Sequence, residues 1–245
     1  AIEYLPVKTK VYRISRDAAL LLKARICLYE GTYRRYRNLE GDAEYLKLAY
    51  EAAGALMDMG HSLYKSATPE QSYFDLFIQD KYDTNPEVIL AREYDASINM
   101  GNNVSNSIPG AIMGMSRDCF EEYLCATTGK PISQCGCHNP DMGQIQEMEN
   151  RDGRLLQTVC LPKAGEYSRY LFREVNGVMT GGASSIFGLL EGTEKKPFYG
   201  TSSTGYAIAK FYKASEHAVG NHKGSIDAPV MRYAEALLIR AEAGA

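Results

Sequence analysis

The chain has no tryptophan, only four histidines among its 245 residues, and no long uncharged apolar segment. No run approaches the roughly 20 apolar residues that a membrane-spanning helix needs. None of the histidines is flanked by an HExxH, GxSxG or other nucleophile motif, so the common signatures of metalloproteases and serine hydrolases are missing around them. The GTSSTG run at 200–205 lacks the lysine and the spacing of a phosphate-binding loop, which favours a flexible loop there.

Acidic and basic residues nearly balance, with a formal net charge of −3. This balance gives no reason to expect nucleic acid or an anionic membrane surface as a partner. Hydrophobic content of 45% and charged content of 23% are typical of globular proteins. The length of 245 residues suffices for one sizeable domain or two small ones.

Two long amphipathic helices are predicted near the start of the chain, over residues 16–36 and 42–59. Ser15 is a suitable N-cap for the first, Asp42 caps the second, and Gly60 is a typical C-terminal stop. A short polar turn joins them, so we expect a helical hairpin that resembles a tetratricopeptide-type pair. One pair cannot bury both of its faces, so further helices must pack on it.

The stretch 227–243 predicts another helix, and we expect the rest of the chain to be organised around it. Asp227 is a good N-cap, because its carboxylate can accept from the N–H groups of the first turn. Pro229 falls within that turn, where a missing N–H costs nothing. Helical spacing then gives one apolar stripe, formed by Val230, Ala234, Leu237, Leu238 and Ala241.

The remainder of the chain alternates short elements with loops. The pattern predicts short helices over 69–81, 117–126 and 144–150, and strands over 85–95, 155–160 and 204–212. Turn-forming residues indicate loops over 96–115, 127–143 and 161–204. The predicted fold is therefore mainly α, with tetratricopeptide-like helix pairs, a long loop-rich insertion and a few short strands.

The sequence contains six cysteines, namely Cys27, Cys119, Cys125, Cys135, Cys137 and Cys160. We expect Cys27, inside an apolar helix, to be a buried thiol. The segment Cys135-Gly136-Cys137-His138 is the sharpest local cluster, because thiolates and imidazole suit zinc. Its C-x-C-H spacing differs from the usual zinc spacings and no second Cys/His pair is close in sequence, so we expect no metal. A disulfide to Cys119, Cys125 or Cys160, or unpaired loop thiols, are the interpretations left open.

Tyrosine is abundant, with 18 Tyr against 7 Phe. Aromatic rings can stack on the apolar faces of sugar rings while amides or acids bind hydroxyl groups, so loop tyrosines beside Asn or Asp are candidates for glycan contact. The candidate ligand-binding residues are Tyr82, Tyr94, Asp95, Asn99, Asn102 and Asn103. The competing interpretation is that most tyrosines pack between helices. Acidic pairs such as Glu121 and Glu122 could serve a glycosidase, but an acid-rich sequence always offers such pairs.

Five segments, in order, resemble the SusD/RagB family: RDAALLLKARICLYEGTYRRY at 16–36, NPEVILAREYD at 85–95, NRDGRL at 150–155, TGYAIAKFY at 204–212 and DAPVMRYAEALLIRAEA at 227–243. The last follows a D-x-P-x-x-R-Y-A-E-x-L-L-x-x-A-E-A pattern without gaps. Gly153 stands where the R-D-P-R-L turn of the family has proline, which should loosen that turn. The resemblance extends over nearly the whole sequence.

The resemblance implies a surface lipoprotein of Bacteroidetes that captures nutrients beside a SusC-like TonB-dependent transporter. It implies a non-catalytic protein without cofactors that binds a glycan on the extracellular face of the outer membrane. We expect the chain, which begins at Ala1 without a methionine, to be a fragment whose longer parent carries the N-terminal lipid anchor. It would be a single partial domain, with the scaffold at 14–80 and 226–245 facing the transporter and a ligand-facing region at 81–225.

Three alternatives stay open. A RagB-like member would capture peptides in the same way. An exported helical glycoside hydrolase would use carboxylates and release products. A plain helical-repeat module would bind a protein partner and no small ligand.

Overall fold

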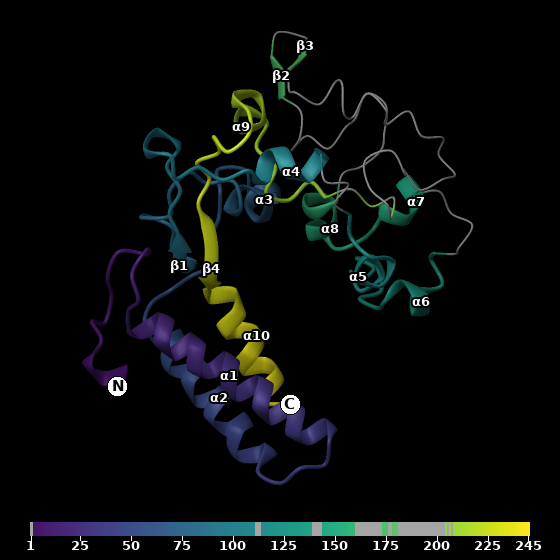
Figure 1. Cartoon of the computed structure of the whole chain (residues 1–245). Helices are drawn as coiled ribbons and strands as arrows, with labels where there is room; N and C mark the ends of the chain where they lie inside the picture. The colour runs from purple at the N-terminus through teal and green to yellow at the C-terminus, as the bar shows by residue number, and fades with distance from the viewer. Residues whose placement is uncertain are drawn as a thin grey trace. The chain divides into compact units, whose positions relative to one another are not determined.

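The computed structural model of the chain describes residues 2–110, 114–138, 144–159, 173–175, 178–180, 204, 206 and 208–245. Helices predominate over strands in these ranges, which confirms the prediction of a mainly α fold (Figure 1). The chain divides into two compact units. Unit 1 comprises Ala1–Tyr64, Gln79–Glu93 and Asp227–Ala245, and unit 2 comprises Lys65–Ile78 and Tyr94–Ile226. A single partial domain with tetratricopeptide-like pairs stays a prediction.

The elements of unit 1 are η1 (Ile2–Tyr4), α1 (Arg16–Tyr36), α2 (Asp42–Met57), β1 (Val88–Arg92), β4 (Ala228–Arg232) and α10 (Tyr233–Ala243). Those of unit 2 are η2 (Pro69–Gln71), α3 (Ser72–Leu76), η3 (Ala96–Ile98), α4 (Val104–Gly110), α5 (Arg117–Glu121), α6 (Ile132–Cys135), α7 (Gln144–Met148), α8 (Gly153–Thr158), β2 (Arg173–Val175), β3 (Val178–Thr180) and α9 (Ala214–Val219). Strand β1 pairs with β4 and β2 with β3, both antiparallel.

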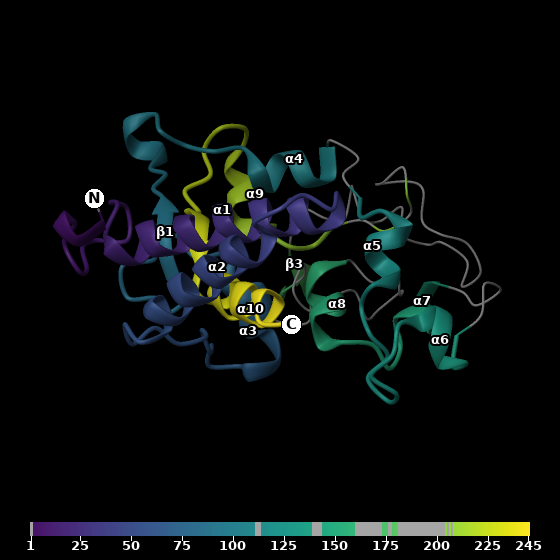
Figure 2. The same ribbon diagram turned by 90° about the horizontal axis from the view of Figure 1, so that it is seen from below.

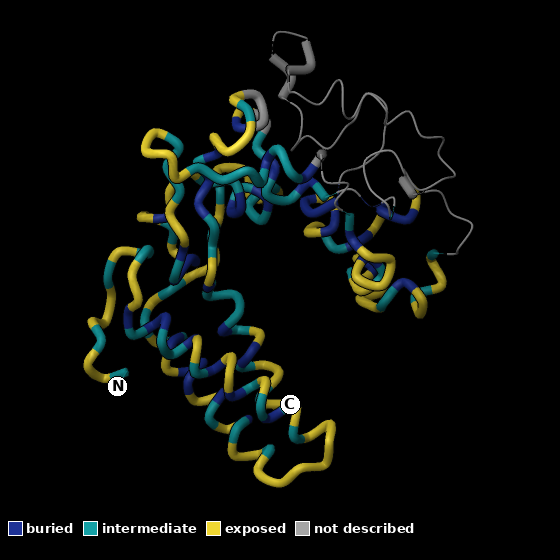
Figure 3. The backbone as a smooth tube through the Cα atoms, in the orientation of Figure 1, coloured by how far each residue is buried: buried dark blue, intermediate teal, exposed yellow. Residues whose placement is uncertain are grey.

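Helices α1 and α2 form the predicted hairpin, and α10 packs against both of them (Figure 2). Helix α1 has the predicted bounds, and α2 ends two residues early. Gly41 rather than Asp42 is the N-cap of α2, and Asp42 is its first residue. Their inner faces carry mostly small side chains, so the helix axes can approach closely. Buried residues alternate with exposed ones along both helices (Figure 3), and the shared core contains Leu21, Ala24, Cys27, Ala49, Ala53 and Leu56. The buried thiol of Cys27 confirms the expectation for that residue.

The prediction of one helix over 227–243 is wrong in its first part, because residues 228–232 form strand β4. Backbone pairing with β1 outweighs the local helix signals, and helix α10 begins only at Tyr233. The carboxylate of Asp227 is buried and does not cap a helix; it accepts a hydrogen bond from the Tyr12 hydroxyl at 2.6 Å. The predicted stripe is also wrong, since Leu238 is 68% exposed while Ala236 and Ile239 are buried.

The β1–β4 pair is reinforced by a buried charged group at its edge. Glu87, directly before β1, accepts from the Arg232 guanidinium at 2.6 Å and from the Tyr64 backbone N–H at 2.8 Å. The Glu87 backbone carbonyl also accepts from the Tyr233 N–H at 2.8 Å, where α10 begins. Because both carboxylate oxygens of Glu87 are hydrogen-bonded, its burial costs little.

A second buried polar group holds the start of α1. His61 Nε2 lies 3.0 Å from Asp17 Oδ2, and both side chains are almost fully buried. Asp17 also accepts from the Ser15 hydroxyl and from the Ala18 N–H. Burial alone would raise the pKa of Asp17, but the bonds from His61, Ser15 and Ala18 outweigh it and hold the pKa below its ordinary value. Ser15 occupies the predicted N-cap position, although its side chain bonds to Asp17 rather than to the helix backbone.

Unit 2 departs from several predicted elements. The expected loop 96–115 contains η3 and α4, and the expected strand 155–160 is helix α8. Helix α8 ends at Thr158 and buries Leu155 in the apolar cluster of unit 2, and Val159, directly after the helix, has an extended backbone that pairs with Ile208. The predicted helix 69–81 ends at Leu76, and the one over 117–126 ends at Glu121, with Ser116 capping it as predicted.

Other predicted segments are only partly described. Cys160 and most of the expected loop 161–204 lie outside the described residues. So do the TGG run at 180–182 and the GTSSTG run at 200–205, except for Thr180 and Thr204. In the described part of 204–212, Ile208 forms an isolated bridge with Val159, and no strand is assigned. No helix in the part of the chain that the structure describes is long and apolar enough to cross a membrane.

Asp17→Asn should lower the free energy of unfolding at pH 7 by roughly 1–3 kcal/mol, because the neutral amide loses charge-assisted hydrogen bonds. The folded-state pKa of Asp17 lies below its ordinary value of 3.8, so the carboxylate contributes stability above that pH. This contribution is lost as the pH falls through the folded pKa. Urea unfolding at several acidic pH values should therefore show a shallower pH dependence for the variant than for the wild type.

The exposed Asp58, which ends α2, provides the control. Asp58→Asn should leave both the stability and its acid dependence nearly unchanged. Equal effects of the two variants would contradict the role of the Asp17–His61 pair.

Candidate functional site

Five of the predicted ligand-binding residues lie in one loop of unit 2, between β1 and α4. The loop is closed by an Asp95–Met100 bridge, in which the Asp95 N–H donates to Met100 O at 3.0 Å and the Met100 N–H to Asp95 O at 2.9 Å. The Asp95 carboxylate caps η3 by accepting from the Ser97 N–H at 2.8 Å and from its hydroxyl at 2.6 Å. Asn99 ends η3 with a left-handed φ of 58° and is exposed, whereas Tyr94 is half-buried.

Asn102 and Asn103 fix this loop with both ends of their amides. Asn102 donates to Ile226 O at 2.9 Å and accepts from the Val104 N–H at 3.0 Å. Asn103 donates to the Ser107 hydroxyl at 3.2 Å and accepts from the His222 N–H at 3.0 Å. These bonds make both residues positioning groups that hold the loop against the segment before β4.

Gly101 allows this close approach. A Cβ at this position would lie 2.2 Å from the carbonyl oxygen of His222, which no side chain can accommodate. The neighbouring Asn102–Gly224 backbone bridge depends on the same spacing. Glycine is therefore needed for the backbone path of the loop.

Tyr82, the sixth predicted residue, lies in unit 1 and has no exposed surface. Its backbone N–H donates to the Tyr12 hydroxyl at 2.9 Å, and that hydroxyl donates in turn to Asp227. Burial, followed by the nearby charge of Asp227, raises the pKa of the Tyr82 phenol above its ordinary value. The ring thus packs in the core of unit 1 and offers no face to a sugar.

Unit 1 also contains a polar pocket of about 330 Å³ beside the Asp17–His61 pair. Its wall includes Lys8, Thr9, Asp83 and Asn85. The serine hydroxyl here donates to the carboxylate, and the carboxylate contacts the imidazole, so the order is Ser15–Asp17–His61. A nucleophilic triad needs the imidazole between serine and carboxylate, and this arrangement does not provide it.

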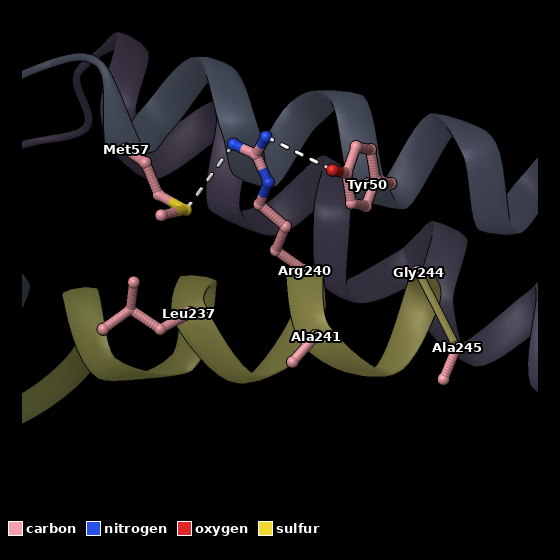
Figure 4. Close-up of a pocket in the computed structure, with 7 residues that line it drawn as sticks. All are labelled: Tyr50, Met57, Leu237, Arg240, Ala241, Gly244 and Ala245. Atoms are coloured by element: carbon pink, nitrogen blue, oxygen red, sulfur yellow. Dashed lines mark hydrogen bonds between the residues drawn. The ribbon is translucent and has the colours of Figure 1, made fainter.

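A shallow groove of about 440 Å³ runs between α2 and α10 (Figure 4). Arg240 of α10 points into it, with its guanidinium 4.6 Å from the ring centre of Tyr50 and 3.8 Å from the Met57 sulfur. The guanidinium also donates to the Tyr50 hydroxyl at 3.4 Å. These contacts join the two helices through a cation–π interaction, which gives the groove a structural role.

The centre of unit 2 is organised by the buried guanidinium of Arg151. It donates to the carbonyl oxygens of Phe120 at 2.6 Å, Tyr123 at 2.7 Å and Glu147 at 2.9 Å. It also lies 4.9 Å from the ring centre of Phe120. Burial lowers the pKa of Arg151 from its usual value, yet arginine stays charged at any physiological pH.

Three cysteine sulfurs converge next to this arginine. The Sγ atoms of Cys125, Cys135 and Cys137 all lie within 4.8 Å of one another, and His138 Nδ1 lies 3.2 Å from Cys135 Sγ. The Thr128 hydroxyl and the nearby backbone N–H groups lower the pKa of the Cys125 thiol to about 6. Hydrogen bonding to Cys135 raises the pKa of Cys137 to about 11. Of the partners considered for a disulfide, the geometry brings Cys125 to the cluster but not Cys119.

Sequence reasoning missed three of these features. The contacts of Asp17 with His61 and of Glu87 with Arg232 join residues far apart in the chain, so no local sequence pattern predicts them. The C-x-C-H run carries thiolate and imidazole donors, but its spacing led us to expect no metal. The third cysteine of the cluster, Cys125, is ten positions upstream of Cys135, and the sequence suggested it only as a possible disulfide partner.

The family model described as the SusD family matches residues 86–245, which is more than half of the sequence. The chain therefore belongs to the SusD family, as the resemblance predicted. Its members are generally non-catalytic, nutrient-binding proteins. No curated protein and no solved structure matches the chain.

Arg151→Ala should lower the free energy of unfolding by at least about 2 kcal/mol, because three buried carbonyl oxygens lose a charged donor. Arg151→Lys should recover little, since a single ammonium cannot span the positions that the guanidinium reaches. Chemical unfolding of the full chain measures both. Arg154→Ala is the matched control, because Arg154 pairs with Asp152 at the surface and such pairs contribute under about 1 kcal/mol. A control as destabilised as Arg151→Ala would contradict this assignment.

Proposed function

We propose that the protein is a non-catalytic, cell-surface glycan-binding protein that captures oligosaccharide or polysaccharide and delivers it to a SusC-like TonB-dependent outer-membrane transporter. The observation that carries the proposal is the SusD family match over residues 86–245. It covers the segments at 150–155, 204–212 and 227–243 that resembled the family in sequence. Anchoring through an N-terminal lipid at the extracellular face of the outer membrane belongs to the same proposal.

The proposed glycan surface is the loop that carries Tyr94, Asp95 and Asn99. Sugar recognition favours polar groups whose positions are set before the ligand arrives, because ordering them on binding costs free energy. The Asp95–Met100 bridge and the amides of Asn102 and Asn103 supply that order. The exposed amide of Asn99 would then meet ligand hydroxyls, with Tyr94 as the aromatic partner.

The proposed surface for the transporter lies on α1. Leu22, Ile26, Tyr29 and Tyr33 are exposed and recur at spacings of four, three and four residues, so they form one apolar stripe on the helix. The rings of Tyr29 and Tyr33 stack with centroids 6.2 Å apart. Exposed apolar stripes of this kind are typical of protein-contact surfaces.

The first test is a binding screen of the full-length protein against a polysaccharide panel by retardation in native gels, with reaction products assayed in parallel. Retardation without products is the expected outcome. Products whose formation depends on a single Asp or Glu would contradict the proposal and favour a hydrolase. Absence of retardation on every glycan, together with co-purification of a large outer-membrane barrel, would favour a peptide-capturing member of the family.

Asn99→Gly tests the loop on the glycan found in that screen. Glycine keeps the left-handed backbone at this position and removes only the amide, so the affinity should fall about 5-fold for one lost hydrogen bond. Asn38 is an exposed asparagine with a φ of 53° in unit 1, so Asn38→Gly is a matched control and should bind as the wild type does. Equal affinities of the two variants would remove Asn99 from the site.

Ile26→Asp tests the stripe on α1. The variant should lose co-purification with the outer-membrane barrel, because a charge in an apolar interface is costly, while its glycan retardation stays unchanged. Leu238→Asp introduces the same charge at an exposed apolar residue of α10 and should leave both the co-purification with the barrel and the glycan retardation unchanged. Undiminished co-purification by Ile26→Asp would place the partner surface elsewhere.

A further inference from the structure

We propose that Cys125, Cys135, Cys137 and His138 form a structural zinc site in unit 2. The inference concerns a site separate from the proposed glycan loop and does not depend on the proposed function. It rests on the convergence of three cysteine sulfurs and on the contact of His138 Nδ1 with one of them, that of Cys135; together these residues supply the donor set of a Cys₃His zinc centre.

The distances suit tetrahedral coordination. With Zn–S bonds near 2.3 Å, two thiolates on one zinc ion lie about 3.8 Å apart, and a thiolate and an imidazole nitrogen lie about 3.6 Å apart. The three sulfurs here already lie within 4.8 Å of one another, and His138 Nδ1 is 3.2 Å from Cys135 Sγ. A contraction of about one ångström would bring the three sulfurs to the spacing of zinc ligands, and rotation of the His138 side chain would supply the fourth donor.

The backbone around the cluster is shaped to bring these donors together. Gly136 ends α6 in the left-handed region with a φ of 66°, so the chain turns back and Cys137 faces Cys135. The Cys137 N–H then donates to Cys135 Sγ at 3.3 Å. Cys125 is held from the other side by a turn in which its N–H donates to Lys130 O at 2.9 Å and its carbonyl accepts from the Gly129 N–H at 2.8 Å.

The electrostatic surroundings also fit. Three thiolates and a neutral imidazole around Zn²⁺ leave a net charge of −1. Arg151, whose side chain is buried and charged, forms a backbone bridge with Cys125. A buried arginine next to the cluster therefore balances the charge that the metal site would carry.

A zinc ion at this position would also stabilise the short helices around it. Helices α5, α6, α7 and α8 have only five, four, five and six residues, which is too short for a helix to be stable without tertiary contacts. A bound metal supplies such contacts in small structures with little core. A disulfide would join only two of the three sulfurs and leave the third sulfur and the imidazole unused, whereas one zinc ion uses all four donors.

Binding is a proton-exchange reaction without any redox change. Zn²⁺ takes the place of the protons on the cysteine thiols, and up to three protons leave to solvent as the zinc–thiolate bonds form. The exposed Cys137 and the half-buried Cys135 give the ion a path to the buried Cys125.

The test is the zinc content of the full chain. The protein is isolated anaerobically and without thiol-alkylating reagents, and its zinc is measured by elemental mass spectrometry. We expect one zinc per chain. Cys125→Ser, Cys135→Ser and Cys137→Ser should each lose it. His138→Ala should weaken the affinity by at least about tenfold rather than abolish binding, because water can take the fourth position on zinc. Cys119→Ser, which removes an exposed thiol outside the cluster, is the control and should keep full zinc content.

Cobalt spectroscopy keeps the proposal testable if a serine variant folds poorly. Co²⁺ added to the metal-free wild-type protein should give the strong d–d bands of tetrahedral coordination and a thiolate-to-cobalt charge-transfer band, both removed by one equivalent of zinc. Zinc content that is the same in the control and in the three cysteine variants would overturn the site. A zinc-free native protein with a disulfide among Cys125, Cys135 and Cys137, mapped by peptide mass spectrometry, would overturn it equally.

Discussion

The antiparallel contact between β1 and β4 is the constraint on which unit 1 depends. It joins Val88–Arg92 to Ala228–Arg232 across more than half of the sequence, and everything in unit 1 after β4 follows from it. Helix α10 starts where β4 ends, with its first N–H bonded to the Glu87 carbonyl, and this start sets which face of α10 meets α1 and α2. The Glu87–Arg232 pair stabilises the same junction, since a buried carboxylate with both oxygens hydrogen-bonded is costly to disrupt.

Unit 2 is held together differently. Its described helices are short, and its main apolar cluster contains Met115, Phe120, Met148, Leu155, Val159 and Tyr206. The stacked rings of Phe120 and Tyr206 lie 4.2 Å apart, and Arg151 joins the carbonyl ends of the surrounding turns. Hydrogen bonds from buried polar groups therefore stabilise unit 2, whereas packing between long helices stabilises unit 1.

The hydrogen bonds that stabilise unit 2 are also relevant to the proposed function. A binding protein needs loops whose polar side chains keep their positions, and loops achieve this through hydrogen bonds rather than through packing. The loop that carries Asn99 is built in this way, with Asn102 and Asn103 bonded at both ends of their amides and Gly101 allowing the backbone of residue 222 to approach. The asparagines that suggested a ligand surface in the sequence thus divide into bracing residues and one exposed amide.

The sequence by itself determined the long helical hairpin and the family. Apolar periodicity and terminal signals located α1 and the start of α2, because long amphipathic helices depend on spacing within one segment. The ungapped pattern at 227–243 indicated the SusD family even though its first residues form a strand rather than a helix. The tertiary structure alone decided that strand, because the hydrogen bonds that favour it come from β1, about 140 residues earlier in the chain. The tertiary structure also decided the burial of Tyr82, the pairing of Asp17 with His61, and the approach of Cys125 to Cys135 and Cys137. Contacts between residues far apart in the sequence depend on the path of the whole chain, which no local pattern specifies.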